Sequence, residues 1–379
     1  MLIHFSLTNY KNFKETQALD LTEGKISEHA RHLLKSPIDR LGILPAAVIY
    51  GPNGSGKTNL LKALWHLRTL VLDAPSVWNE DCAFCFDPAS QKSPTEYEII
   101  FRVEQMEYNY QLKMTPRGLT EENLFARRLQ DSFYDVVFDR DGEGIFLCPA
   151  LEDLDVSALT DQQPFLYFLS LSRKKQRLQP VFDFFQNMIF LSDSSVSLEM
   201  EDIFLRAKAN REELLALLQT MTPSITDLRI HQKEISFVHT IQEKSLTLSW
   251  DAEASGICQL LIFAAALLQT RKNGALLLAD TPELHLHPMI LEKLYLLCTN
   301  QEKNPHGSQL LAVTHENSTM NNGIFRRDEL WITAPQADGS SLLYPLSLYL
   351  KKNGEKVRKD ETYSKQYLEG RYGGLPDIV

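Results

Sequence analysis

A glycine-rich stretch near the start of the chain has the residues of a phosphate-binding loop. Residues 51–58 read GPNGSGKT, which matches G-x-x-x-x-G-K followed by Ser or Thr at every position. In such a loop the glycines let backbone N–H groups face phosphate oxygens, the lysine reaches the β- and γ-phosphates, and the last hydroxyl binds Mg²⁺. The stretch therefore predicts a site for ATP and Mg²⁺. The residues expected to hold the nucleotide are Gly51, Asn53, Gly54, Ser55, Gly56, Lys57, Thr58 and Asn59.

A second stretch, residues 274–288, contains an apolar run that ends in an acid. It reads GALLLADTPELHLHP, and Asp280 follows four apolar residues. In proteins with this type of loop, a carboxylate at such a strand end helps to hold Mg²⁺. The alternative is a strand that merely ends in a solvated Asp, and the phosphate-binding loop upstream disfavours it. Thr58 and Asp280 are therefore the expected Mg²⁺ ligands.

Two further positions could meet the phosphates. His315 follows the apolar stretch QLLAV, where its side chain could reach the γ-phosphate; a capping or core histidine is the alternative. Ser255 and Gly256 open a predicted helix. The free N–H groups at a helix start suit a second phosphate cradle, although this turn alone does not define a site.

Composition narrows the class of protein. The chain has 379 residues, a formal net charge of −10 and five cysteines. The acidic balance argues against non-specific coating of nucleic acid, although a local basic patch could still bind a nucleic-acid backbone. The cysteine number does not fit a disulfide framework, no secretory signal opens the chain, and the apolar run 260–268 is too short to span a bilayer. We therefore expect a cytoplasmic protein with no membrane segment.

The elements around the loop follow the order strand, loop, helix. The apolar run 46–50 precedes the loop, and apolar residues at helical spacing follow it. Residues 96–103 and 108–114 alternate in polarity, as antiparallel strands do. From about 126 to 222, apolar residues three and four apart predict helices. We therefore expect an N-terminal lobe with the loop (1–125), a helical insertion (126–222) and a C-terminal lobe (223–379).

The C-terminal lobe alternates strands and helices. The expected elements are strands at 225–230, 234–241 and 245–250, a helix at about 257–270, a strand at 275–279, a helix at about 289–299 and a strand at 309–313. Such alternation around a phosphate-binding loop predicts an α/β fold with a doubly wound mixed sheet and its ligand at the strand ends. An antiparallel β part completes this fold, and the helical insertion interrupts it.

The order of the motifs resembles that of the ABC-type AAA-family ATPases related to OLD proteins and to bacterial abortive-infection systems. The motifs that carry the resemblance are LTNYKNFKE, GPNGSGKTNLLKAL, EASGICQLL, LADTPELHLHP, QLLAVTHENS, FRRDELWIT and YLEGRYGGLPDI. The resemblance implies an ABC-type P-loop NTPase head that forms a homodimer or a higher homo-oligomer. Each ATP then lies between the loop of one subunit and the signature turn of the other.

The resemblance also implies roles for single residues and for the protein. Lys57, Thr58, Asp280 and His315 are expected to act on the nucleotide of their own subunit. Ser255 and Gly256, in the signature turn, are expected to act on the nucleotide of the other subunit. The implied biology is antiphage defence, with an effector protein, a nuclease or a toxin, encoded nearby.

Two departures from the family pattern bear on hydrolysis. Family members read Asp-Glu-Pro-Glu at the second motif, and the first glutamate positions the attacking water; here Thr281 takes its place. A positioned base contributes about 10²- to 10⁴-fold, so we expect slow hydrolysis, with Glu283, His315 and Thr281 as the candidate catalytic residues. Glu283 is the obvious replacement base, although the family already has a glutamate there. The signature reads EASG at 253–256 where the family has Glu-Ser-x-Gly, and Ser255 compensates if the turn shifts by one residue.

Other interpretations stay open from the sequence. A DNA-repair or chromosome-maintenance ATPase of the RecF or SMC kind, with DNA as its partner, is the alternative function, although the chain has no long heptad arms. Glu283, His285, His287 and His315 could form a metal site, or they could make ordinary polar contacts at a strand-to-helix junction. The run SRKKQR at 172–177 is either a solvated helix face or a patch that binds a backbone.

Overall fold

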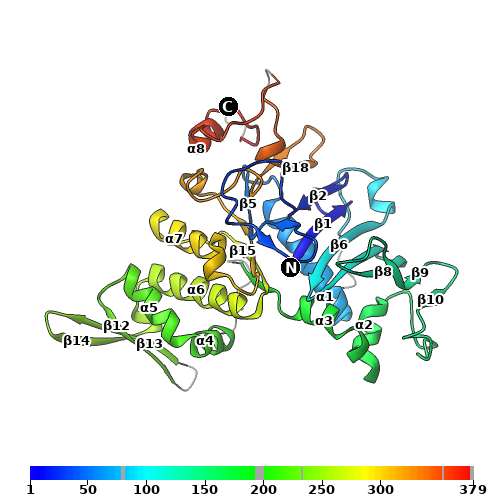
Figure 1. The fold of residues 1–379 in the computed structure, drawn as a ribbon, viewed down its shortest axis with the longest axis horizontal. Helices are drawn as coiled ribbons and strands as arrows, with labels where there is room; N and C mark the ends of the chain where they lie inside the picture. Colours follow the sequence, from blue (N-terminus) through cyan, green and yellow to red (C-terminus); the bar gives the residue numbers. More distant parts are fainter. Residues whose placement is uncertain (78–81, 193–199, 232–233, 352–353, 376–379) are drawn as a thin grey trace.

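A six-stranded sheet lies at the centre of the protein (Figure 1). The computed structural model describes residues 1–77, 82–192, 200–231, 234–351 and 354–375. The strands of the central sheet, in spatial order, are β11 (Ile189–Leu191), β15 (Leu276–Asp280), β16 (Gln309–Val313), β5 (Ala46–Tyr50), β17 (Leu330–Pro335) and β18 (Ser341–Pro345). The first five strands run parallel to one another, and β18 pairs antiparallel with β17.

The central sheet is buried on both faces. All five residues of β5 are buried, with Ala47 and Ile49 in one apolar core and Ala46, Val48 and Tyr50 in the other. Alternate side chains of a strand point to opposite faces, so one short apolar run supplies both cores. Because the first five strands run parallel, their carboxyl ends meet at one edge of the sheet.

One core lies between the central sheet and a seven-stranded antiparallel sheet. That sheet has the order β10 (Ile145–Leu147), β9 (Asp135–Arg140), β8 (Gly118–Arg128), β7 (Met106–Thr115), β6 (Thr95–Val103), β1 (Leu2–Thr8) and β2 (Gln17–Asp20). The helices that contribute to this core are α1 (Lys57–Val77), α2 (Phe165–Ser170) and α3 (Gln179–Gln186). Figure 1 shows α1, α2 and α3 beneath these strands.

The other core lies on the opposite face of the central sheet. Its helices are α4 (Met200–Ala209), α5 (Arg211–Met221), α6 (Ser255–Asn273), α7 (Pro288–Thr299) and α8 (Tyr363–Leu368). A three-stranded sheet of β12 (Ile225–His231), β13 (Glu234–Ile241) and β14 (Lys244–Ser249) extends from this side (Figure 1). Two short strands, β3 (Leu34–Lys35) and β4 (Gly42–Ile43), form a separate antiparallel pair.

The expected α/β class with an antiparallel part is confirmed, and the structure differs from expectation in the middle of the chain. Residues 126–147 were expected to be helical, but they extend β8 and form β9 and β10. Residues 189–191 were also expected to be helical, and they pair with β15 in the central sheet because their apolar side chains are buried there. Helices α2 to α5 follow between residues 165 and 221. The division of the chain into three parts remains a prediction.

The described part of the chain stops within the terminal motif. The final residues of the terminal motif, 376–378, lie outside the described residues. Within the part of the chain that the structure describes, no helix combines the length and apolar character that crossing a membrane requires.

Candidate functional site

The glycine-rich loop connects the end of β5 to the start of α1. Gly54 and Gly56 have φ angles of 78° and 84°, which an L side chain rarely adopts. A Cβ atom at Gly56 would lie 1.8 Å from Nδ2 of Asn12, whereas one at Gly54 would meet nothing within 4 Å. The loop encloses a cavity of about 340 Å³, lined by residues 53–59 and by His315. The sequence therefore places its glycines where backbone direction and close packing require them.

Lys57 lies across the loop. Its Nζ donates hydrogen bonds to the carbonyl oxygens of Gly51 and Pro52 at 2.8 and 2.9 Å, and the residue is buried. Burial lowers the pKa of the ammonium to about 8, against the opposing fields of Asp280 and Glu283. A cation that is removed from water and held only by carbonyls gains from an anionic ligand. The arrangement therefore fits the phosphate groups of a nucleotide.

Thr58 and Asp280 lie together, although they are 222 residues apart in the chain. Thr58 Oγ1 donates to Asp280 Oδ1 at 3.1 Å, and burial raises the pKa of that carboxyl. A hydroxyl and a carboxylate at the end of a strand are hard oxygen donors of the kind that Mg²⁺ uses, with water and phosphate oxygens as its other ligands. The chemistry of the pair fits Mg²⁺, and its role as the metal site stays a prediction.

The alternative metal site has no support in the geometry. In residues 1–77, 82–192, 200–231, 234–351 and 354–375, no group of three or more His, Cys, Asp or Glu side chains is arranged to hold a metal ion. Among these side chains, Glu283 and His287 each contact a backbone N–H instead, Glu283 that of His315 and His287 that of Met289. These contacts correspond to the polar junction that was the other interpretation.

Thr281 has an unusual backbone at the end of β15. Its φ angle is 53°, which is uncommon for a β-branched residue. Its Oγ1 donates to the carbonyl oxygen of Asp280 at 2.8 Å, and its N–H donates to the carbonyl oxygen of Val313 at 2.8 Å. The hydroxyl proton of Thr281 is therefore already engaged. This side chain offers no carboxylate where the family pattern has one.

Glu283 and His315 are joined beside the loop. Oε1 of Glu283 accepts a hydrogen bond from the backbone N–H of His315 at 2.7 Å. Oε2 of Glu283 is buried and has no hydrogen-bond partner among the described residues. Burial and the charge of Lys57 lower the pKa of His315, against the opposing fields of Glu283 and Asp280. Glu283 thus fixes the turn that holds His315, and its second carboxylate oxygen has no hydrogen bond to the described residues.

Ser255 and Gly256 lie away from this cavity in the single chain. They begin α6, Ser255 is exposed, and neither residue is among those that line the loop cavity. The residue before them, Ala254, provides no side-chain cap for the N–H groups of the first turn. A Cβ atom at Gly256 would lie 2.8 Å from the carbonyl oxygen of His285, so this glycine lets the turn pack against the loop that follows Asp280.

Two residues at the site had not been predicted. Asn12 donates to the carbonyl oxygen of Ser55 at 3.3 Å and accepts from Nδ2 of Asn59 at 2.7 Å. Thr333 and Ser55 share a hydrogen bond of 2.6 Å between their hydroxyls. Asn12 lies within the LTNYKNFKE motif, which carries part of the family resemblance but predicts no role for this residue. Asn53 and Asn59, both expected to bind nucleotide, line the cavity, and Asn59 also supports the loop through Asn12.

Comparison with known proteins identifies the family. Residues 46–321, which include the loop, the signature turn, Asp280 and His315, match the family described as "AAA domain, putative AbiEii toxin, Type IV TA system". The chain belongs to this AAA family. No curated protein sequence matches the chain.

Solved structures show the fold of this AAA-family chain. The Smc head domain with a coiled coil and joint from Pyrococcus yayanosii is similar with a TM-score of 0.50 and 11% sequence identity, over 97% of this chain and 99% of that one. The SMC head domain from Thermotoga maritima has a TM-score of 0.48 and 12% identity, over 91% of this chain and 98% of that one. The first likeness shows the mixed α/β fold of an ABC-type P-loop ATPase head, with its antiparallel sheet. At this identity it shows the fold alone.

Proposed function

We propose that this chain is an ATP-dependent switch of an abortive-infection defence system, which hydrolyses ATP slowly and controls a partner effector. The observation that carries the nucleotide part is the pairing of Thr58 with Asp280 at 3.1 Å beside the glycine-rich loop. The defence role and the effector, a nuclease or a toxin, are supported by the family description, which names a putative toxin of a type IV system. The relation to OLD proteins remains part of this proposal.

The residues of the loop suit the binding of Mg²⁺-ATP. The ammonium of Lys57, now held by two backbone carbonyls, would bind phosphate oxygens, and their negative charge would favour its protonated form. Thr58 Oγ1 and Asp280 Oδ1 are the oxygen atoms that would hold Mg²⁺. When bound, Mg²⁺ neutralises charge on the phosphate oxygens. The backbone N–H groups of the loop would bind the phosphates in the cavity that His315 also lines.

Slow hydrolysis follows from the residues around Asp280. Thr281 can orient a water molecule through its hydroxyl oxygen, but at neutral pH it carries no charge with which to take a proton. Glu283 has a carboxylate oxygen without a protein partner in the described part of the chain, so it is the residue we assign as the remaining base. Its other oxygen holds the backbone N–H of His315, which limits how far the carboxylate can move.

A homodimer, or a higher homo-oligomer, completes the site in this proposal. Ser255 and Gly256 do not reach the loop cavity of their own chain, and they begin a helix whose first N–H groups have no side-chain cap. Uncapped N–H groups at a helix start attract anions. The γ-phosphate bound in a second subunit is such an anion, and its binding there joins the two heads.

Copurification tests the role in defence. The tagged chain is expressed with its neighbouring genes, and bound proteins are identified by mass spectrometry for wild type and for Lys57→Ala. We expect an effector encoded nearby, recovered in a different amount with the variant. Recovery of no neighbouring protein, combined with sensitivity to DNA damage when the gene is deleted, would contradict the proposal and favour a repair ATPase of the RecF or SMC kind.

A further inference from the structure

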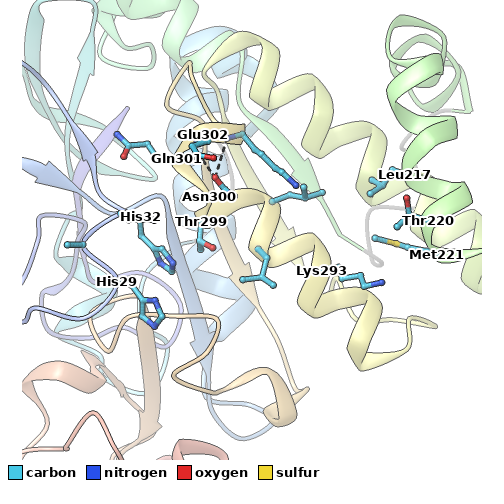
Figure 2. A pocket seen from close by; sticks show the side chains of 15 residues that line it. His29, His32, Leu217, Thr220, Met221, Lys293, Thr299, Asn300, Gln301 and Glu302 are labelled. Carbon is cyan, nitrogen blue, oxygen red and sulfur yellow. Dashed lines mark hydrogen bonds between the residues drawn. The ribbon is translucent and has the colours of Figure 1, made fainter.

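A second cavity, larger than the one at the loop, opens between three segments of the chain. It has a volume of about 1030 Å³ and lies among the loop that carries His29 and His32, the end of α5, and α7 with the 3₁₀ turn Gln301–Lys303 that follows it. Figure 2 shows α7, which carries Lys293, between the two histidines on one side and Leu217, Thr220 and Met221 of α5 on the other. None of its lining residues lines the loop cavity. Its size matches the upper end of small-molecule pockets.

One part of the cavity is apolar. Leu217 and Met221 lie one turn apart on α5, and Leu296 and Leu297 line the cavity from α7. Leu296 is 38% exposed, and Leu217, Met221 and Leu297 are half-buried. Their partial exposure leaves apolar surface that a bound molecule could remove from water.

Cationic side chains surround this apolar surface. Arg31, Lys293 and Lys303 line the cavity and are exposed, and none of them forms an ion pair within the described residues. Glu302 is the single acidic residue of the described lining. This excess of positive charge occurs in a chain whose formal net charge is −10, so it is a local feature. Such a surface attracts anions.

The other part of the cavity presents hydrogen-bonding groups. The rings of His29 and His32 are stacked with centroids 4.7 Å apart, and Nε2 of His29 donates to the carbonyl oxygen of Asn322 at 2.6 Å. Thr299, at the end of α7, is 1% exposed, and its Oγ1 has no hydrogen-bond partner in the part of the chain that the structure describes. A buried hydroxyl of this kind is costly unless a ligand or water completes its hydrogen bonding.

We propose that this cavity binds an organic anion. The apolar body of the anion packs between α5 and α7, and its acidic group lies among the basic side chains. A polar substituent reaches Thr299 and the imidazoles. The chemistry that the cavity recognises is therefore a carboxylate or phosphate on an aliphatic or aromatic body. This proposal rests on lining residues that are separate from the glycine-rich loop, so it stands or falls independently of the proposed function.

The test uses two fluorescent probes of similar shape and different charge. 8-Anilinonaphthalene-1-sulfonate carries a sulfonate, whereas N-phenyl-1-naphthylamine is uncharged. Titrations compare the full-length wild type with Lys293→Met/Lys303→Met, which keeps the apolar stems and removes two charges, and with Met221→Glu, which places an acid on the apolar wall. Lys244→Met, at an exposed position of β14 remote in sequence, is the matched control for loss of a lysine. Circular dichroism checks that each variant folds.

We expect the double variant and Met221→Glu each to weaken binding of the anionic probe at least five-fold, while Lys244→Met leaves it unchanged. Binding of the uncharged probe should change less than two-fold in the double variant. Decanoate and decyl phosphate should displace the anionic probe, and their relative strength distinguishes a carboxylate from a phosphate ligand. Equal effects of the double variant on both probes would overturn the proposal, as would displacement by an acidic helical peptide but by neither small anion.

Discussion

Thr281 has a strained backbone conformation, and its side chain has no carboxylate that could act as a base. A β-branched residue at a φ angle of 53° is strained, and its hydroxyl donates to the carbonyl oxygen of Asp280. Glutamate tolerates this backbone better and supplies a carboxylate. We expect Thr281→Glu to raise the single-turnover rate of ATP hydrolysis ten-fold or more, the lower end of general-base effects. Affinity for Mg²⁺-ATP should survive, because Asp280 is unchanged.

The matched variant for this prediction is Glu283→Gln. It keeps an acceptor for the backbone N–H of His315, which is now 2.7 Å from Oε1, but it cannot take a proton. Single-turnover hydrolysis of ATP by Glu283→Gln should therefore be slower than hydrolysis by the wild type. If the wild type already turns over briskly and only Glu283→Gln stops it, Glu283 is a fully competent base and the slow switch is wrong.

Lys57 gives a separate test of nucleotide binding. Lys57→Ala removes a buried ammonium that donates to two carbonyls of the loop, and with it the main contact to the β- and γ-phosphates. Calorimetric titration with Mg²⁺-ATP should show no binding. Thermal unfolding of the variant without nucleotide serves as the control for folding. An affinity equal to that of the wild type would exclude the assignment of the loop.

The sequence was sufficient for some site residues and insufficient for others. Lys57, Thr58 and Asp280 belong to spaced motifs, and the parallel order of β15, β16 and β5 brings them to one edge of the sheet. Thr333 had no such signal, because it reaches Ser55 from 278 residues away through a hydrogen bond that no local pattern encodes. Spacing reports a motif, whereas only the fold reports contacts between elements.

At the scale of the element, substitutions at two glycines of the loop distinguish the cost of backbone strain from the cost of a close contact. Gly54 and Gly56 have nearly equal φ angles, but a Cβ atom has open space at Gly54 and meets Asn12 at 1.8 Å at Gly56. Gly54→Ala should lower the free energy of unfolding by about 1–2 kcal/mol, the cost of a left-handed backbone. Gly56→Ala should lower it further. Urea unfolding without nucleotide measures both, and equal losses would contradict the close contact.

Elements were predictable where their patterns were long or bounded. The strand at 309–313 and the helix at about 289–299 were expected almost at their observed bounds, because their apolar patterns are distinct. By contrast, β11 has three residues at the end of a helical pattern, and its pairing with β15 determines its conformation. β9 and β10 were missed because pairing with neighbouring strands, rather than the local spacing of apolar residues, determines their conformation.

At the scale of the molecule, stability should depend on pH through His66. Its side chain is buried beside Tyr97 and Cys82, and burial lowers its pKa from 6.5 to about 4. Between these values the unfolded chain binds the extra proton, so the stabilisation is complete above pH 6.5 and is lost as the pH falls toward 4. The loss from this group is about 1.4 kcal/mol per pH unit.

Urea unfolding at pH 7.5 and pH 5 measures this dependence for wild type and for His66→Gln. The variant keeps a polar side chain near Tyr97 but cannot titrate, so its stability should fall less between the two pH values. Because other groups titrate in the same range, the difference between the two proteins is the informative quantity. Identical pH dependence in both would mean that His66 is not protonated on unfolding.

ATP should cause two heads to associate, and a substitution at Ser255 allows this association to be tested separately from nucleotide binding. Ser255 is exposed and does not line the loop cavity of its own chain, while Gly256 packs against the carbonyl of His285 and is a poor site to change. Ser255→Glu adds a negative charge where a phosphate of the second subunit would lie. In a two-fold dimer the same repulsion acts at both sites.

With a non-hydrolysable ATP analogue, the wild type should therefore sediment as a dimer or a multiple of it. Ser255→Glu should bind the analogue with normal affinity and remain monomeric, whereas Ser245→Glu, at an exposed position of β14, should behave as the wild type. A variant that neither binds nor associates would place Ser255 in the site of its own chain. A wild type that stays monomeric at micromolar concentration with saturating analogue would contradict the two-headed arrangement, because each nucleotide would then be held by one subunit alone.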